Sequence, residues 1–366
     1  MKIAVTGSNG FISKNLIYNL IENKNLEILK INRKTSKRLV NKHLLNADVI
    51  CHFAGVNRPS KDKTFAKDNI GLTSYICNLL EKNKKKTKII FSSSSQINYK
   101  NNYGMSKLLC EKILIKFAKK NSSSLKILRI PNVFGKWSKP NYNSVVATFC
   151  YNISRNKKIY IPEPSKIIKL IYVDDLILTI KKLILKRDNT IKIKVFKNTK
   201  ATTVNNLLEL IKKFEIQRSN YNISPFKNNF EKNLYSTYIS YLPKNKISYK
   251  LKANKDKRGS FIEFLKCNEI GQFSIFTAKK KQTRGNHFHH SKVEKFFVLS
   301  GVGEFFMSDI TSNKKIKIKL NANNPKVVES IPGWQHYIKN TGKNDLIVML
   351  WSNDVFNINK PDTYRV

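Results

Sequence analysis

One stretch near the start decides the fold of the first half of the chain: Lys2-Ile3-Ala4-Val5-Thr6-Gly7-Ser8-Asn9-Gly10-Phe11-Ile12-Ser13. Residues 2–6 are mostly apolar and predict a buried strand, and apolar residues then recur at helical spacing up to Leu20. The glycine turn between strand and helix brings backbone N–H groups and the positive end of the helix dipole against a pyrophosphate. The stretch therefore indicates a βα unit that binds a dinucleotide.

The same alternation of strand and helix continues along the chain. We expect further strands at residues 26–31, 49–53, 88–91 and 125–130, with helical segments between them. Such alternation predicts an α/β fold of the Rossmann type, with a parallel sheet covered by helices on both faces.

The character of the sequence changes beyond residue 244. From residue 251 onward, short alternating segments are separated by Gly, Asn and Pro turns, which predicts an all-β barrel or jelly roll. We place the domains at residues 1–245 and 246–366, because the sequence around this boundary is polar and poor in structure-forming residues.

The formal net charge of +45 raises the question of a nucleic-acid partner. The lysines are spread over every segment and do not gather in one arm or helix with interleaved aromatic residues. This favours solvated lysine faces over a nucleic-acid surface, and we expect no nucleic-acid partner. The charge would still help to attract an anionic substrate.

Targeting features indicate a soluble, cytoplasmic protein with no membrane partner. The apolar run at the N-terminus is too short for a signal peptide, and no stretch approaches the roughly 18 apolar residues that cross a bilayer. The five cysteines are scattered without a CxxC pair, which favours reduced thiols over a disulfide framework: Cys51, Cys77, Cys110, Cys150 and Cys267.

The end of the second predicted strand bears on the choice of cofactor. It reads Asn32-Arg33, with no acidic residue where an NAD enzyme would hold the ribose 2′-hydroxyl, and an arginine suits a 2′-phosphate instead. We therefore expect NADPH rather than NADH. The alternative is that Arg33 is one more surface cation of a basic protein.

A catalytic pair is indicated by Tyr103-Gly104-Met105-Ser106-Lys107, which follows the serine run at residues 92–95. The i, i+4 spacing puts Tyr103 and Lys107 on one helix face, where the ammonium can lower the pKa of the tyrosine from about 10 towards neutrality. A tyrosine with such a pKa is a general acid for a ketone being reduced, and one serine would bind the same carbonyl oxygen.

These motifs resemble the extended short-chain dehydrogenase family of nucleotide-sugar enzymes over roughly residues 1–245. Further landmarks of the resemblance are the segments 48–55, 69–71, 129–135 and 172–175. The resemblance implies Ser94, Tyr103 and Lys107 as the catalytic residues. For the cofactor it implies Gly7, Ser8, Asn9, Gly10, Phe11, Ile12, Asn32, Arg33, Ala54, Gly55, Lys107 and Pro131. For the substrate it implies Asn132, Lys136, Trp137 and Asn143.

Other polar residues of these landmarks have a structural interpretation. Cys51 and His52 lie within a predicted buried strand and belong to the core, and Asp174 and Asp175 are expected to cap a helix. Dehydratases of this family carry an acidic pair after the catalytic serine and threonine, whereas this chain has Ser95-Gln96. Dehydration is therefore disfavoured.

A second site is indicated by His287-x-His289, Glu294 and His336. On a strand, His287 and His289 lie on one face because side chains alternate, while His290 points away or caps the strand end. Three histidines and one glutamate are good ligands for one divalent metal of the zinc type, with room left for water or substrate.

This pattern resembles both motifs of the cupin family over about residues 258–366. Two turn positions depart from it, since Lys281 replaces a glycine and Pro332 stands one position late. The alternative to a metal site is a metal-free cupin that binds sugar in the same cavity. The residues leave the base of this site open among Lys295, Tyr337 and Asp362.

The two halves together resemble bifunctional enzymes of capsular polysaccharide synthesis. That resemblance implies a UDP-linked 4-keto-6-deoxy-N-acetylhexosamine, epimerised at C3 in the cupin and then reduced at C4, giving UDP-2-acetamido-2,6-dideoxy-L-talose for N-acetyl-L-fucosamine biosynthesis. We also expect a homodimer. Two alternatives are a single-function sugar-nucleotide reductase or 4-epimerase with a structural cupin, and a non-enzymatic regulator that senses a dinucleotide.

Overall fold

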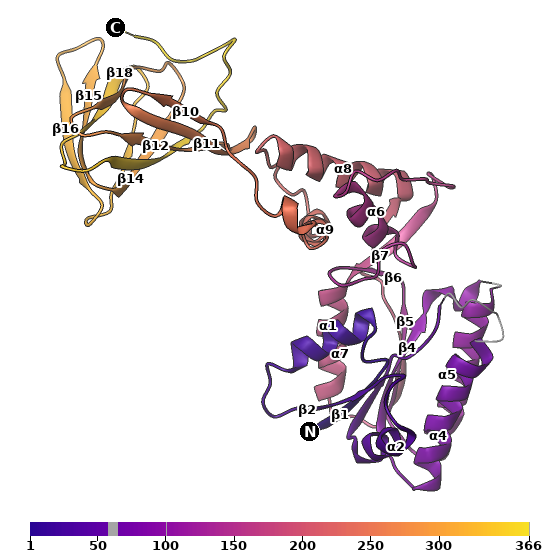
Figure 1. Ribbon diagram of the computed structural model, residues 1–366. Coiled ribbons are helices and arrows are strands. Elements are labelled where there is room, and N and C mark those ends of the chain that lie inside the picture. The colour runs from indigo at the N-terminus through magenta and orange to yellow at the C-terminus, as the bar shows by residue number, and fades with distance from the viewer. Residues whose placement is uncertain (58–64, 100, 366) are drawn as a thin grey trace. The chain divides into compact units, whose positions relative to one another are not determined.

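The computed structural model describes residues 1–57, 65–99 and 101–365 (Figure 1). The described chain forms two compact units. Unit 1 is Met1–Lys212 with Asn228–Pro243, and unit 2 is Lys213–Lys227 with Lys244–Val366. The boundary between residues 245 and 246 stays a prediction, and the contacts assign the additional segment 213–227 to the second unit.

The main sheet of unit 1 has six strands, and every pair of neighbours is parallel. In spatial order they are β2 (Glu27–Ile31), β1 (Lys2–Thr6), β3 (Val49–His52), β4 (Lys88–Ser94), β5 (Leu125–Ile130) and β8 (Ile191–Val195). Strands β1 to β5 lie close to the predicted residues, because each has an apolar run that stops at a polar or glycine-containing turn. Strand β8, which is exposed and alternates with lysine, was not predicted.

Helices cover both faces of this sheet (Figure 1). On one face lie α1 (Phe11–Leu20) and α7 (Val173–Leu185), whose core includes Leu16 and Ile177. On the other face lie α2 (Lys37–Asn46), α4 (Leu72–Lys82) and α5 (Asn102–Lys120), packed around residues such as Ile50. The predicted Rossmann-type fold class is confirmed.

Unit 1 also carries a smaller sheet and further helices. The sheet consists of β6 (Asn132–Phe134), β7 (Ile167–Tyr172) and β9 (Lys200–Thr203). The helices are α6 (Val145–Ile153), the first part of α8 (Val204–Ser219) and α9 (Asn229–Ile239). Tyr241 follows α9, and its hydroxyl donates to the carbonyl oxygens of Gly135 and Ser138 at 3.2 and 2.6 Å. This contact holds the loop that carries the predicted substrate residues.

Unit 2 is an antiparallel barrel made of two sheets, as predicted. The first sheet, in spatial order, contains β10 (Ala253–Asp256), β11 (Gly259–Cys267), β12 (Gly271–Ala278), β19 (Leu346–Ser352), β14 (Glu294–Ser300) and β17 (Val327–Glu329). The second contains β13 (Thr283–His287), β18 (Trp334–Asn340), β15 (Val302–Asp309) and β16 (Lys315–Asn321). Phe296, Phe305 and Leu350 are among the buried side chains between the sheets.

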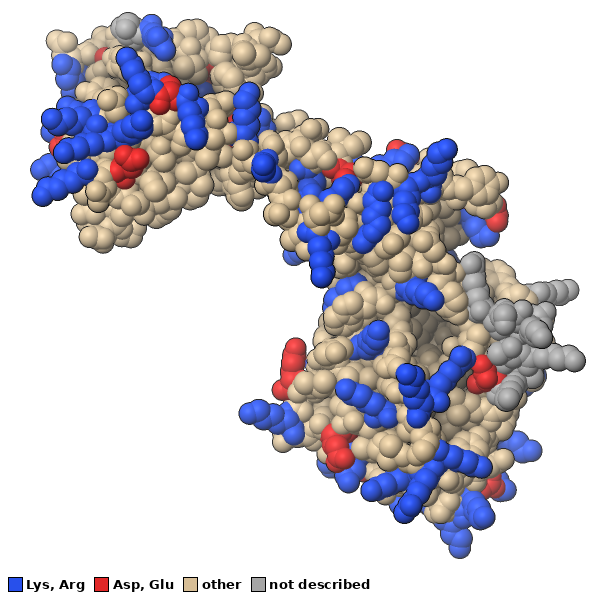
Figure 2. Space-filling view, in the orientation of Figure 1, with Lys and Arg blue, Asp and Glu red and all other residues tan. Residues whose placement is uncertain are grey.

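The basic side chains are dispersed over the visible face of each unit in Figure 2, with few acidic side chains among them. Strand β16, for example, carries the exposed Lys315, Lys317 and Lys319. No helix in the described part of the chain is long and apolar enough to cross a membrane.

Candidate active site and metal centre

The glycine turn is required by a close approach between two strand ends. Gly7 has a φ of +66°, and a Cβ there would lie 2.8 Å from Cα of Ala54, which follows β3. Thr6 holds the same junction, because its hydroxyl oxygen accepts the N–H groups of Phe53 and Ala54 at 3.1 Å each. The structure thus brings the predicted cofactor residues of β1 and β3 together.

The start of α1 offers donors to an anion. Gly10 is the N-cap, and the first turn contains no acidic residue and no side-chain cap among the described residues. The Oγ atom of Ser8 is buried and lacks a hydrogen-bond partner in residues 1–57, 65–99 and 101–365. Exposed helix amides and an orphaned hydroxyl fit the pyrophosphate of a dinucleotide.

Arg33 has an acidic partner that sequence reasoning missed. Its guanidinium forms an ion pair with Asp68 at 3.0 Å, although the Arg33 side chain is 83% exposed. Asp68 belongs to the short π-helical segment η1 (Ala66–Gly71), which lies 35 residues further along the chain. Arg33 remains accessible for a ligand phosphate, but its charge is partly neutralised.

The start of α5 places Tyr103 beside Ser94. The side chain of Asn101 caps Gly104 N–H at 2.7 Å, and a Cβ on Gly104 would lie 2.2 Å from the carbonyl oxygen of Gln96. Only glycine therefore lets the helix start against the short helix η2 (Ser95–Asn98) that follows β4. Tyr103 and Ser94 form a side-chain hydrogen bond.

The expected effect of Lys107 on Tyr103 is wrong in this structure. Burial raises the pKa of Tyr103 to about 12, although a hydrogen bond from Ser94 acts to lower this pKa. The ammonium of Lys107 instead donates to the carbonyl oxygen of Ser92 at 2.8 Å, beside Gly55. Burial lowers the pKa of Lys107 to about 8, although Cys110 and Glu111 act in the opposite direction.

The predicted substrate residues lie after β5. Lys136 forms an ion pair with Asp174 at 2.7 Å, and Trp137, half exposed, contacts the ring of Tyr18 with centroids 5.3 Å apart. Asn132 donates from its side chain to the carbonyl oxygen of Lys169, and Asn143 is exposed. Pro131 joins β5 to β6.

Two structural interpretations from the sequence have different outcomes. His52 and Cys51 are buried in β3, as predicted. Asp174 and Asp175 lie inside the first turn of α7, whose N-cap is Tyr172 without a side-chain cap bond. The capping prediction is therefore wrong, because the Asp174 carboxylate pairs with Lys136 instead.

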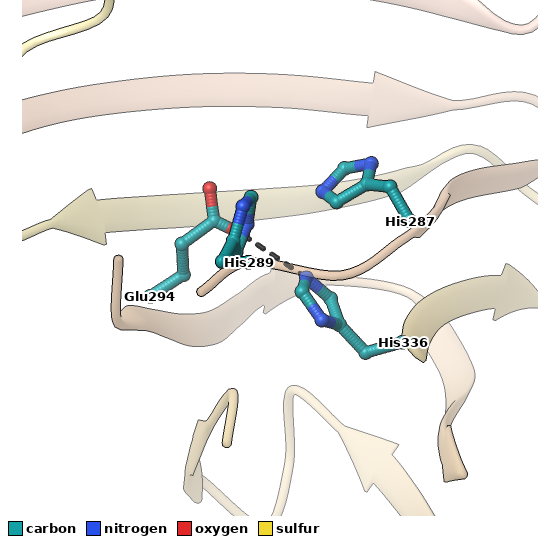
Figure 3. A group of neighbouring side chains, drawn as sticks. All are labelled: His287, His289, Glu294 and His336. Carbon is teal, nitrogen blue, oxygen red and sulfur yellow. Dashed lines mark hydrogen bonds and ion pairs between the residues drawn. The ribbon is translucent and has the colours of Figure 1, made fainter. Parts of the chain in front are cut away.

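The four predicted metal ligands meet inside the barrel of unit 2 (Figure 3). Their candidate ligand atoms all lie within 4.8 Å of one another. A bulge at Gly285 and Asn286, where both residues have positive φ, puts His287 opposite His336 on β18. His289 follows on the same loop, and Glu294 starts β14.

The donor set fits a divalent cation. The Nε2 atoms of His287 and His289 are buried and have no hydrogen-bond partner among the described residues. Glu294 Oε2 lies 3.2 Å from Nε2 of His336 and 3.4 Å from Nε2 of His289. Burial opposes ionisation of Glu294, but the facing imidazoles of His289 and His336 hold its pKa well below the usual range. Burial also lowers the pKa of His287 to about 4. Neutral imidazoles and a carboxylate suit zinc.

Three of the four residues, His287, Glu294 and His336, line a cavity of about 410 Å³. Of the three candidates for a base, Tyr337 lines this cavity. Lys295 is exposed and paired with Glu329. Burial raises the pKa of the Asp362 carboxyl, but hydrogen bonds from three consecutive amides outweigh it and hold this pKa well below its usual range. A carboxylate with so low a pKa is a poor base.

Sequence reasoning missed Lys292 in this cavity. Its side chain is 12% exposed, lines the cavity and has its Nζ 3.9 Å from Oε1 of Glu294. The signal was available as a lysine two residues before a predicted ligand, but the chain is so rich in lysine that the position did not stand out.

Comparison with known proteins agrees with both units. The model of the NAD dependent epimerase/dehydratase family matches residues 3–197, more than half of the chain. The chain belongs to the NAD dependent epimerase/dehydratase family. The polysaccharide biosynthesis C-terminal domain matches residues 254–364 of this family member.

Similar proteins cover the whole of this epimerase/dehydratase family member. The UDP-2-acetamido-2,6-beta-L-arabino-hexul-4-ose reductase of Pseudomonas aeruginosa is 40% identical over 365 residues, which span 100% of this chain and 98% of that protein. The crystal structure of the capsular polysaccharide assembling protein CapF from Staphylococcus aureus is 40% identical, with a TM-score of 0.93 and full coverage of both chains. The resemblance to the capsular polysaccharide enzymes is thereby confirmed. A UDP-glucose 4-epimerase from Thermotoga maritima, 22% identical with a TM-score of 0.53, covers 66% of this chain and 98% of its own and shows the fold alone.

Proposed function

We propose that the chain is a bifunctional sugar-nucleotide enzyme of surface polysaccharide (N-acetyl-L-fucosamine) biosynthesis. Unit 2 epimerises a UDP-linked 4-keto-6-deoxy-N-acetylhexosamine at C3, and unit 1 then reduces C4 to give UDP-2-acetamido-2,6-dideoxy-L-talose. The observation that carries the proposal is the 40% identity over the whole chain to a reductase of a UDP-linked hexul-4-ose. The Tyr103 and Ser94 pair, in the same unit as the glycine turn, supports it.

In the reduction, NADPH supplies the hydride when bound. The hydroxyl of Tyr103 donates its proton to the C4 carbonyl oxygen as hydride reaches C4, so that the ketone becomes an alcohol. Ser94, hydrogen-bonded to Tyr103, orients the same oxygen. Lys107 keeps a positive charge beneath the site through its bond to Ser92 O.

NADPH is preferred over NADH in this proposal because Arg33 stands two residues after β2 and the adjoining sequence, Asn32-Arg33-Lys34, holds no acidic residue. A carboxylate there would repel a 2′-phosphate, whereas a guanidinium binds one in a bidentate manner. The ion pair with Asp68 holds Arg33 near the strand end but competes with the phosphate for its charge.

In the epimerisation, the C3 proton is acidic only while C4 is a ketone, which places this step before the reduction. One zinc-type ion, held by His287, His289, Glu294 and His336, would polarise the ketone. Tyr337 and Lys292 are the cavity residues that we propose as proton carriers. Asp362 is not among them.

We further propose that the enzyme acts as a homodimer in the cytoplasm. All five cysteines lie in the described part, are buried and form no disulfide, which supports a reducing compartment.

A second candidate is a single-function reductase with a structural cupin, and it is favoured by the name of the relative, which states a reductase activity alone. One experiment separates the two. The keto-sugar nucleotide is supplied with NADPH in D2O, and NADPH oxidation and deuterium entry at C3 are followed separately.

The bifunctional proposal expects both signals. Tyr103→Phe should lower NADPH oxidation by about 100-fold or more and leave C3 exchange intact, since general acid catalysis contributes roughly 10² to 10⁴. His287→Ala should abolish C3 exchange. Exchange that persists in His287→Ala, or NADPH oxidation that persists in Tyr103→Phe, would contradict the corresponding assignment.

A further inference from the structure

The segment Pro361–Arg365 lies against the loop that carries two of the metal ligands. The N–H of Phe288 donates to the carbonyl oxygen of Tyr364 at 2.9 Å, and the N–H of Tyr364 donates back to Phe288 at 3.0 Å. The Tyr364 ring also contacts the rings of Phe288 and His290, with centroids 5.4 and 4.6 Å apart. This segment and the loop are thus joined on both sides of His289.

Asp362 binds the loop through its carboxylate. Oδ1 accepts the N–H of His290 at 2.9 Å, and Oδ2 accepts the N–H groups of Ser291 and Lys292 at 2.8 Å each. The Ser291 hydroxyl adds a fourth bond at 2.9 Å. Three consecutive amides turned towards one carboxylate fix the backbone between His289 and Glu294, because charge-assisted hydrogen bonds are the strong ones.

The backbone of Asp362 also sets the tautomer of His289. Nδ1 of His289 forms a hydrogen bond with the carbonyl oxygen of Asp362, and a carbonyl oxygen can only accept. The proton therefore resides on Nδ1. Nε2 is then the unprotonated nitrogen, and it is the buried, unpartnered atom that faces Glu294. His289 is only 1% exposed, so bulk solvent does not reach its ring.

A further contact ties the same segment to the cavity. The ammonium of Lys292 donates to the hydroxyl of Thr363 at 3.2 Å, and Thr363 itself lines the cavity. Asp362, Thr363 and Tyr364 therefore all contact the His287–Lys292 loop.

We propose that Asp362 is a positioning residue of the metal centre: it holds the His287–Lys292 loop and makes His289 present Nε2 to the ion. The inference rests on the metal site of the proposed function. It replaces the role of base, because the carboxylate oxygens are already occupied by four donors.

The test measures zinc affinity by competition with a chromophoric chelator on the full chain. Asp362→Asn keeps the size of the side chain but sets an NH2 group against amide donors and removes the charge. We expect its zinc affinity to fall by about 10- to 100-fold, the usual effect of mutating an outer-shell residue of a metal site, because the loop that carries His289 loses its charge-assisted bonds. The ¹⁵N spectrum of the unmodified zinc form should show His289 protonated at Nδ1.

The matched control is Asp309→Asn. Asp309 also accepts hydrogen bonds within a turn, from Thr311 and Ser312, but its side chain does not touch the His287–Lys292 loop. The thermal midpoint of each metal-free variant is measured in parallel. A merely structural Asp362 would lower that midpoint and leave zinc affinity unchanged, which would overturn the proposal.

Three outcomes separate the claims. If the unmodified chain does not bind zinc, the metal site of the proposed function fails. If the unmodified chain binds zinc and the zinc affinity of Asp362→Asn is within twofold of its own, only the proposed role of Asp362 is contradicted. If Asp362→Asn does not fold, hydrogen–deuterium exchange on the unmodified chain decides, since zinc must slow exchange of the amides at 290–292 and at Tyr364 together; unchanged exchange rejects the proposal.

Discussion

Arg33 illustrates how a single residue acquires a partner that no local pattern contains. From the sequence it is a cation at a strand end, and in the structure it shares its charge with Asp68 from a different element. Both residues keep exposed surface, so the pair costs little to open, as surface ion pairs contribute about 1 kcal/mol or less. A 2′-phosphate would compete with Asp68 for the guanidinium.

We predict that Arg33→Ala raises KM for NADPH by about tenfold, since a charge-assisted contact contributes roughly 1.4 kcal/mol or more. KM for NADH should not change. Asp68→Asn is the matched variant, and it should lower KM for NADPH because Arg33 becomes free. Steady-state kinetics with each cofactor check the prediction, and an equal effect on both cofactors would show that Arg33 does not read the phosphate.

At the scale of elements, a buried chain of hydrogen bonds joins β1, β3 and α4 through His52. Thr6 Oγ1 already accepts two N–H groups, so its hydroxyl donates to Nδ1 of His52 at 2.9 Å. Nε2–H then donates to Thr73 on α4 at 3.0 Å, and the Thr73 hydroxyl donates to Asn69 O at 2.8 Å. Nδ1 of His52 accepts a hydrogen bond and Nε2 donates one, so the imidazole must be neutral.

This network predicts a loss of stability in acid. Burial, with the charge of Lys107, lowers the pKa of His52 to about 3 from an unfolded value near 6.5. Between these values the unfolded state binds more protons, so the free energy of unfolding falls as pH drops from about 6.5 to about 3. The loss should reach up to about 4 kcal/mol.

Urea unfolding of the wild type and His52→Gln between pH 4 and 7 measures this contribution. The variant has no group that titrates at this position, so its stability should change less over the same interval. Equal pH dependence of the two proteins would contradict the prediction. It would mean that His52 can be charged in the folded state, or that another group takes over its role as hydrogen-bond donor.

At the scale of the whole molecule, each proposed reaction belongs to one unit. The ligands that would hold the metal all come from unit 2, and the Tyr103 site lies wholly in unit 1. Removal of the metal should therefore affect one reaction only.

We predict that treatment with a strong chelator abolishes deuterium entry at C3. The same protein, given the keto-sugar already epimerised at C3, should oxidise NADPH at its former rate. Zinc added back restores exchange and serves as the control. A chelated protein that loses both activities would show that the metal supports unit 1 as well.

The sequence by itself determined the class of each domain and the four candidate metal ligands. Periodicity of apolar residues and short-range spacing carry this information, because a strand alternates every two residues and a helix repeats every 3.6. The glycine turn, the Tyr103 and Lys107 spacing and His287-x-His289 are all of this local kind.

The tertiary structure alone decided which partners these residues meet. Asp68 lies 35 residues from Arg33, and Asp362 lies 73 residues from His289. The orientation of Lys107 towards Ser92 O and the high pKa of Tyr103 depend on burial, which spacing does not reveal. Long-range contacts and desolvation arise only when separate elements pack, and for that physical reason Asp362 is one of three candidate bases in the sequence, whereas in the fold its carboxylate accepts the amides of residues 290–292.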